Sequence, residues 1–223
     1  MIRTITYKEY LKIRRPFLAI LAINLVAVAY VWLETRELFR KEHAEMVWYQ
    51  VLQLGRLYYG ALEYAPVAVG VALALVQFLP EMRNERIRLS LHLPVDASAM
   101  MLAHFGAGLA ALCCCLAVQA AGLAWITRAW FPAEALTLAF GTWLPWALAG
   151  VAGYLGVVLT LLEPSFPRRL CNLAAAAGVV GLFYRDVPPG VYAGVLPWLV
   201  VSIPLLFLAD LHPAYRYRSR RAG

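Results

Sequence analysis

A run of mixed charges between two long apolar stretches is the part of this sequence best suited to bind a soluble partner. It extends from Pro80 to Asp96 and reads PEMRNERIRLSLHLPVD. The residues expected to make contacts are Glu81, Arg83, Glu85, Arg86, Arg88, His92, Pro94 and Asp96. Exposed charges of both signs give specificity to a protein–protein contact. We therefore expect this stretch, called here the charged segment, to be a cytosolic docking surface.

A second, shorter charged connection follows a later apolar stretch. Its chemistry-bearing residues are Glu163, Arg168 and Arg169, and Pro164 and Pro167 make the connection stiff. One interpretation is that it braces the same soluble partner beside the charged segment. The other is a simple turn with the basic residues that are typical of the cytosolic side of a membrane protein.

Glu63 is the one acid clearly inside a predicted membrane span. Acids within the membrane usually face a cavity or a charged partner, so Glu63 is our candidate for the substrate pathway. Two structural roles remain open. The carboxylate can reach the membrane interface, or it can pair with Arg56, which lies two helical turns earlier.

The sequence holds no motif for catalysis or for binding of nucleotide or metal. A phosphate-binding loop, a G-x-S-x-G elbow and an H-E-x-x-H motif are absent, and the four histidines are scattered. Cys113, Cys114 and Cys115 are consecutive, and consecutive helical side chains point about 100° apart. We therefore interpret the cysteines as small packing residues, and we expect no metal or cofactor in this chain.

The composition is that of an all-α membrane protein. The 223 residues are 62% hydrophobic and 15% charged, whereas soluble domains carry about 25% charged residues. About 20 apolar residues form a helix that crosses the ~30 Å hydrocarbon core. We predict six such spans, of which the fifth is short: 16–33, 57–80, 99–127, 135–162, 170–184 and 190–209.

The basic residues set the orientation of these spans. If both termini are cytosolic, 14 of the 20 lysines and arginines lie on the cytosolic side. The positive-inside rule favours that arrangement, which predicts a multi-pass protein of the cytoplasmic (inner) membrane. The net charge of +7 follows from this bias and from contact with anionic membrane lipid, so we expect no nucleic-acid partner.

The remaining segments lie outside the six-span domain at 16–210. Residues 1–15 alternate apolar and basic side chains, which predicts an amphipathic helix on the inner leaflet or a simple basic anchor. Residues 211–223 form a basic cytosolic tail. Residues 34–56 are expected to be helical at the outer interface, with Glu37 and Lys41 spaced for an i,i+4 ion pair.

The charged segment resembles the inner loop of type-2 ABC exporter permeases. In that family the second span leads into an acidic and basic cluster, a leucine-proline-valine-serine motif and a helix that carries a lysine. The counterpart here is Leu93-Pro94-Val95-Asp96, in which Asp96 replaces the serine. His104 stands where the lysine is common.

The resemblance implies a permease subunit that is not itself an enzyme. A separate soluble ABC ATPase would bind ATP and Mg²⁺, and the charged segment would act as the coupling loop between spans two and three. A second permease copy, identical or related, would complete the substrate path along the first and fifth spans. The fifth span offers small residues for close helix approach: Ala174, Ala175, Ala177, Gly178 and Gly181.

Two other functions remain open. The chain can be a non-catalytic assembly or scaffold subunit of a membrane complex. The chain can also be a membrane-embedded enzyme that uses Glu63 or His104 as acid or base, but its motifs fit this function less well. A mostly apolar path between two permease copies would suit an amphipathic or lipid-like cargo better than a small ion.

Overall fold

The computed structural model describes residues 2–83, 97–184, 194 and 196–219, and over these residues the chain is helical without strands. The main helices are α1 (Ile2–Lys41), α2 (Ala44–Leu52), α3 (Ala65–Arg83), α5 (Ala97–Trp130), α6 (Glu134–Leu162), α7 (Phe166–Leu182) and α8 (Leu196–Ser219). A short 3-10 turn, η1, covers Gly60–Leu62. The predicted all-α class is confirmed for the described residues.

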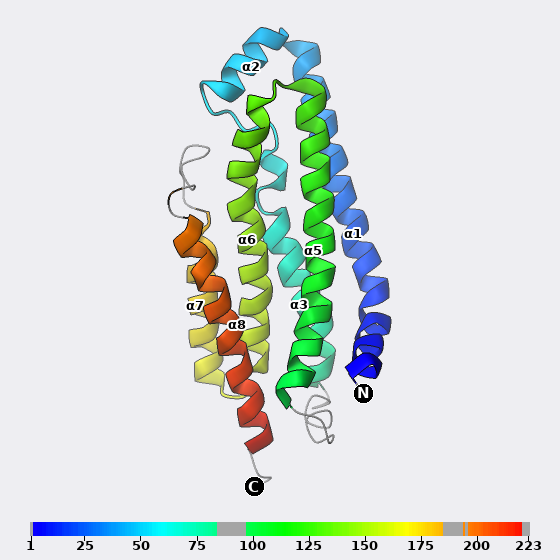
Figure 1. Cartoon of the computed structure of the whole chain (residues 1–223), viewed down its shortest axis with the longest axis vertical. Coiled ribbons are helices and arrows are strands. Elements are labelled where there is room, and N and C mark those ends of the chain that lie inside the picture. Colours follow the sequence, from blue (N-terminus) through cyan, green and yellow to red (C-terminus); the bar gives the residue numbers. More distant parts are fainter. Residues whose placement is uncertain (1, 84–96, 185–193, 195, 220–223) are drawn as a thin grey trace.

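The helices run up and down in one elongated bundle (Figure 1). α3 packs against α6, α1 packs against α5, and the pair α7 and α8 packs on α6. Both chain termini lie at one end of the bundle, called here the terminal end. α2 lies across the other end, called the opposite end, and the pair α7 and α8 stops well short of it.

Four helices among the described residues are long and apolar enough to cross a membrane. Their spans are Tyr7–Lys41, Gly60–Met82, Met100–Trp130 and Glu134–Leu162. The chain is therefore a multi-pass membrane protein. α7 has 17 residues, and the apolar part of α8 is confined to Leu196–Asp210. The number of six spans stays a prediction.

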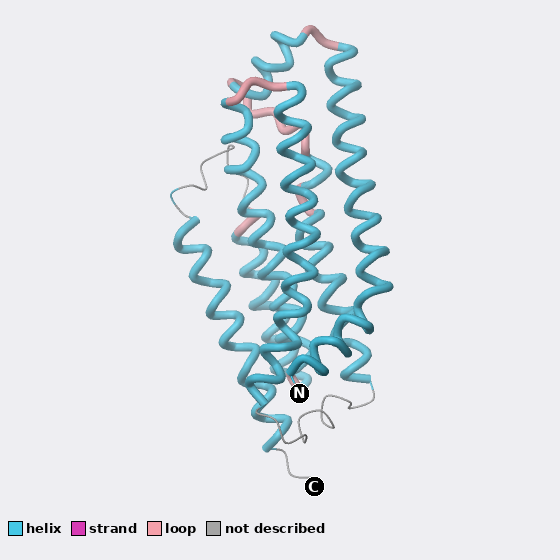
Figure 2. Tube along the Cα trace, turned by 45° about the vertical axis from the view of Figure 1, so that its right-hand side comes forward, coloured by secondary structure: helices cyan, strands magenta, loops and turns pink. Residues whose placement is uncertain are grey.

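The first helix is longer than the sequence predicted. α1 continues from Ile2 through Pro16 to Lys41, so residues 2–15 are joined to the first span instead of forming a separate helix. Proline removes one backbone hydrogen bond, which a long helix tolerates with a bend. Figure 2 shows that the first turns of α1 are bent relative to the rest of the helix and run across the terminal end of the bundle. On these turns Glu9 is buried, whereas Tyr10 is 57% exposed.

The second predicted span, 57–80, begins later than expected. α3 starts at Ala65, and Glu63 lies between η1 and α3 instead of inside a long helix. The aromatic residues just before η1 explain the difference. Tyr58 and Tyr59 are 5% and 3% exposed and pack in a buried aromatic cluster, and Tyr58 stacks on Phe131 with ring centroids 4.3 Å apart.

Glycines let α3 and α6 approach backbone to backbone. A β-carbon on Gly70 would lie 2.1 Å from the carbonyl oxygen of Gly150, and one on Gly150 would lie 2.7 Å from that of Pro66. Small residues at a crossing give membrane helices close van der Waals contact, which is a main source of their association. The crossing brings α3 and α6 together above the polar side chains described next.

Candidate functional site

The charged segment begins in the last turn of α3, where Glu81 is fixed to α1. Glu81 is only 4% exposed. Its Oε1 lies 3.2 Å from the Nζ of Lys12 and 3.4 Å from the Nζ of Lys8. Arg83 is the last residue of α3. The other predicted contact residues lie outside the described residues: Glu85, Arg86, Arg88, His92, Pro94 and Asp96.

Glu9 on α1 is a buried acid at the terminal end. Its side chain is fully buried. Oε1 accepts a hydrogen bond of 2.7 Å from Lys12 and lies 3.5 Å from Nε2 of His104 on α5. Oε2 accepts a hydrogen bond of 3.1 Å from Nε2 of Gln77 on α3. One carboxylate therefore contacts three helices.

Gln77 connects Glu9 to α5 and α6. Its Nε2 also donates to the backbone carbonyl of His104 at 2.7 Å, and its Oε1 accepts a hydrogen bond of 2.8 Å from the Tyr154 hydroxyl. The pair needs a glycine beside it. A β-carbon on Gly108 would lie 2.0 Å from the Tyr154 hydroxyl oxygen and 2.2 Å from Oε1 of Gln77.

These side chains form one network, called here the terminal cluster, in which Lys8 is exposed, Lys12 is partly buried and the other members are buried: Lys8, Glu9, Lys12, Gln77, Glu81, His104 and Tyr154. Its two carboxylates face two ammonium groups, which satisfies the rule that buried charges are paired. Losing one partner would leave an uncompensated buried charge. The cluster thus holds α1, α3, α5 and α6 in one arrangement at the terminal end.

The histidine of the cluster is enclosed by contacts within the protein. His104 is 3% exposed, and its Nδ1 lies 2.9 Å from the carbonyl oxygen of Met100. With Glu9 on the other ring nitrogen, both nitrogens are engaged inside the protein. A catalytic base must come within hydrogen-bond reach of its substrate, and nothing can approach His104 without opening the bundle.

Asp210 on α8 is a further buried acid, in addition to Glu9 and Glu81. It is fully buried, and neither carboxylate oxygen has a hydrogen-bond partner among the described side chains. α8 packs against α6 and α5, so it adds a buried carboxylate to the bundle.

The second charged connection forms a braced turn between α6 and α7. Arg169 donates from Nε and Nη2 to the carbonyl oxygen of Glu163, at 3.2 and 2.9 Å. A cation at this position is favourable because the last carbonyls of a helix carry partial negative charge. Glu163 is 3% exposed, whereas Arg168 is exposed. Of Glu163, Arg168 and Arg169, only Arg168 is exposed enough to contact a partner.

Glu63 lies in a different part of the molecule from the terminal cluster. Its backbone carbonyl accepts a hydrogen bond of 2.9 Å from the Tyr184 hydroxyl, and Tyr184 stacks on Tyr64 with centroids 5.0 Å apart. Arg56 pairs with Glu42 at 3.6 Å.

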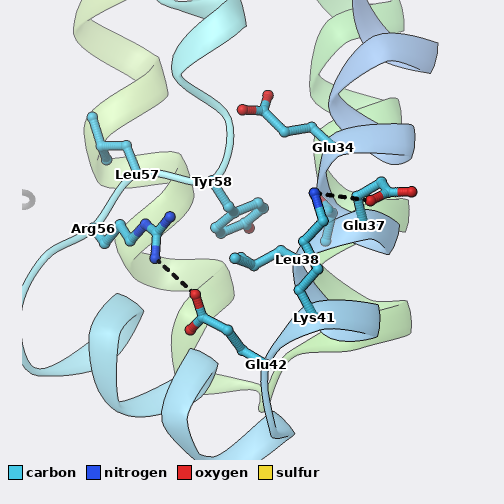
Figure 3. A pocket seen from close by; sticks show the side chains of 9 residues that line it. Glu34, Glu37, Leu38, Lys41, Glu42, Arg56, Leu57 and Tyr58 are labelled. Atoms are coloured by element: carbon cyan, nitrogen blue, oxygen red, sulfur yellow. Dashed lines mark ion pairs between the residues drawn. The ribbon is translucent and has the colours of Figure 1, made fainter.

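A pocket of about 250 Å³ lies at the opposite end between α1 and the segment after α2 (Figure 3). Four of its five charged residues form ion pairs: Lys41 lies 3.1 Å from Glu37, as the i,i+4 spacing predicted, and Arg56 contacts Glu42. The side chains of Glu37 and Lys41 are 48% and 70% exposed. Exposed pairs of this kind contribute little to stability.

The three consecutive cysteines point to different surroundings, as the helical geometry predicted. Cys115 is buried, and its carbonyl accepts a hydrogen bond of 2.9 Å from Asn24, whereas Cys113 and Cys114 are exposed. Across the part of the chain that the structure describes, no three His, Cys, Asp or Glu side chains lie close enough together to hold a metal ion.

Sequence reasoning named Glu81 and His104 but missed Glu9, Gln77 and Tyr154. A signal was present: Glu9 is the only acid before Glu34, and Gln77 is a polar residue within an apolar span. The partners stand 68 and 77 residues apart in sequence, so only the fold brings them together. No family model, no curated protein and no solved structure matches this chain.

Proposed function

We propose that this chain is the permease subunit of an ATP-driven exporter of the type-2 ABC class. The terminal end faces the cytosol, and a separate ATPase docks on the charged segment. Two permease copies form the substrate path. The observation that carries the proposal is the terminal cluster, because it links the start of the charged segment to four helices through buried polar contacts.

The cluster supplies a mechanical route for such a partner. A partner that displaces residues 83–96 would first move the end of α3. Because Glu81 on α3 is paired with Lys8 and Lys12, α1 would move with it. Because Gln77 on α3 is bonded to His104 and Tyr154, α5 and α6 would move as well. Buried polar networks favour discrete arrangements over gradual deformation, because half-satisfied states are costly.

Orientation and cargo follow from the same proposal. Both termini are cytosolic, and Glu63 belongs to the outer part of the path, where it is the acidic group nearest to an apolar cavity between copies. The exposed small residues of α7, among them Ala174 and Gly178, are available for the second copy. Reporter fusions after Gly223 and at Glu42 test the orientation, since they are expected on opposite sides of the membrane.

Purification tests the function directly. The tagged chain, extracted from its native membrane in mild detergent, is expected to bring along a soluble protein that hydrolyses ATP. A scaffold subunit would bring partners without this activity. Recovery of the chain with no nucleotide-hydrolysing partner, under conditions that keep it folded and monodisperse, would reject the proposal.

A further inference from the structure

An apolar pocket on the flank of the bundle goes beyond the transport function. It has a volume of about 440 Å³ and lies between the first turns of α1 and the adjoining part of α5. Its lining comprises Tyr10, Ile13, Arg14, Phe17 and Leu18 on α1, and Ala107, Ala110, Ala111 and Cys114 on α5. Both sets follow helical spacing, so one face of each helix forms a wall.

The pocket has the shape and surroundings of a site for a hydrocarbon chain. Its α5 wall consists of alanines and one cysteine, and such short side chains leave a slot between the helices. Both walls belong to segments that are long and apolar enough to span the membrane. Further from the terminal end the helices close together, since Asn24 on α1 donates to Cys115 on α5 at 2.9 Å.

The single charged residue in the pocket lining indicates which kind of ligand would bind there. Arg14 is the one formally charged residue in the lining, and it is exposed. A packed helix from another chain would have to bury this guanidinium, which is costly in a membrane. A phospholipid instead brings an anionic phosphate to the guanidinium and an acyl chain to the apolar walls. Basic pockets between membrane helices bind anionic lipid headgroups in this way.

We infer that this pocket binds one anionic glycerophospholipid from the leaflet at the terminal end, with an acyl chain between α1 and α5 and the phosphate on Arg14. Tyr10 lies one helical turn before Arg14 on the same face of α1, and an aromatic hydroxyl suits the headgroup region. Lipid binding at this pocket does not require the ATPase partner. The bound lipid would hold the bent first turns of α1 against α5.

Native mass spectrometry of the purified full chain tests the site with two matched pairs of variants. The probes are phosphatidylglycerol and phosphatidylcholine with identical acyl chains. Arg14→Gln removes the proposed phosphate ligand, and Arg15→Gln removes the same charge from an exposed neighbour outside the pocket. Ala110→Phe fills the slot, and Ala117→Phe adds the same ring two turns further along the exposed side of α5.

The wild-type chain is expected to retain one phosphatidylglycerol in preference to phosphatidylcholine. Arg14→Gln should lower that preference about three- to tenfold, the size expected for one partly exposed ion pair with a lipid phosphate. Arg15→Gln and Ala117→Phe should leave it unchanged, and Ala110→Phe should abolish retention. Equal losses in the two arginine variants, or normal retention by Ala110→Phe, would mean bulk annular lipid only and overturn the inference.

Discussion

The two ends of the bundle use charge in opposite ways. At the opposite end, ion pairs such as Glu37–Lys41 sit on the surface of one helix, and the interior is aromatic. At the terminal end the carboxylates of the ion pairs are buried, and Glu81 on α3 pairs with Lys8 and Lys12 on α1, so these pairs join different helices. Surface pairs mainly adjust solubility, whereas buried pairs fix one arrangement of helices. The arrangement of helices is therefore held by charge mainly at the terminal end.

The largest expected effect comes from breaking the terminal cluster at its most buried acid. Glu9→Ala removes the carboxylate that Gln77 contacts and leaves Lys12 with Glu81 as its one acidic partner, so two ammonium groups share one carboxylate. We expect a loss of up to about 3–5 kcal/mol in the free energy of unfolding. Glu9→Gln keeps the size and part of the hydrogen bonding, so its loss should be smaller. Unfolding in mixed micelles measures both. A change near zero for Glu9→Ala would show that the buried charges do not hold the helices.

A steric change in the same place should have the next largest effect. Gly108→Ala places a methyl group against Tyr154 and Gln77, and overpacking of this kind costs about 1–3 kcal/mol. Gly106→Ala is the matched control, because a β-carbon there meets nothing within 4 Å. Alanine favours helix over glycine, so the control should be neutral or more stable. Equal destabilisation by the two variants would contradict the packing described at Gly108.

At the opposite end, a buried neutral hydrogen bond offers a smaller effect. The Tyr58 hydroxyl and the Thr127 hydroxyl lie 2.5 Å apart. Tyr58→Phe removes this bond but keeps the stacked ring, so we expect a loss of about 1 kcal/mol. Thr127 keeps its other hydrogen bond, which it donates to the Leu123 carbonyl. Tyr49→Phe, at an exposed tyrosine, is the control, and the same unfolding assay should show no change for it.

The smallest effect is expected at the exposed pair. Lys41→Gln removes an ion pair whose side chains are mostly in solvent, so unfolding should be unchanged within experimental scatter at both low and high salt. The assay is the one used for Glu9. A destabilisation comparable to that of Glu9→Ala would erase the distinction between the two ends.

The sequence predicted the long apolar helices well because their composition is a local signal. The predicted span 135–162 differs from α6 by one residue at its start. Where prediction failed, tertiary contacts outweighed local ones. Pro16 suggested a break, but α1 continues through it because Glu9 and Lys12 anchor its first turns. Tyr58 and Tyr59 looked like the start of a span, but they fill a buried aromatic cluster.

The candidate site was predictable only in part. Charge patterning predicted that Glu81 contacts a soluble partner from an exposed position, whereas the side chain is buried against α1. Its links to Lys8 and Lys12 span about seventy residues of sequence, and no spacing rule connects them. Contacts of this kind follow from how helices cross, which a single sequence does not encode locally.

The central claim is that a separate ATPase docks on the charged segment. The most direct test measures how much ATPase is purified with each of two charge-neutralised variants. The first variant replaces Arg83, Glu85, Arg86 and Arg88 with glutamine at the terminal end; the second replaces Arg36, Glu37, Arg40 and Lys41 in the same way at the opposite end. Thermal unfolding and gel filtration confirm that both remain folded. We expect the ATPase to be lost from the first variant and retained by the second. Full retention by the first variant, or equal loss from both, would contradict this claim.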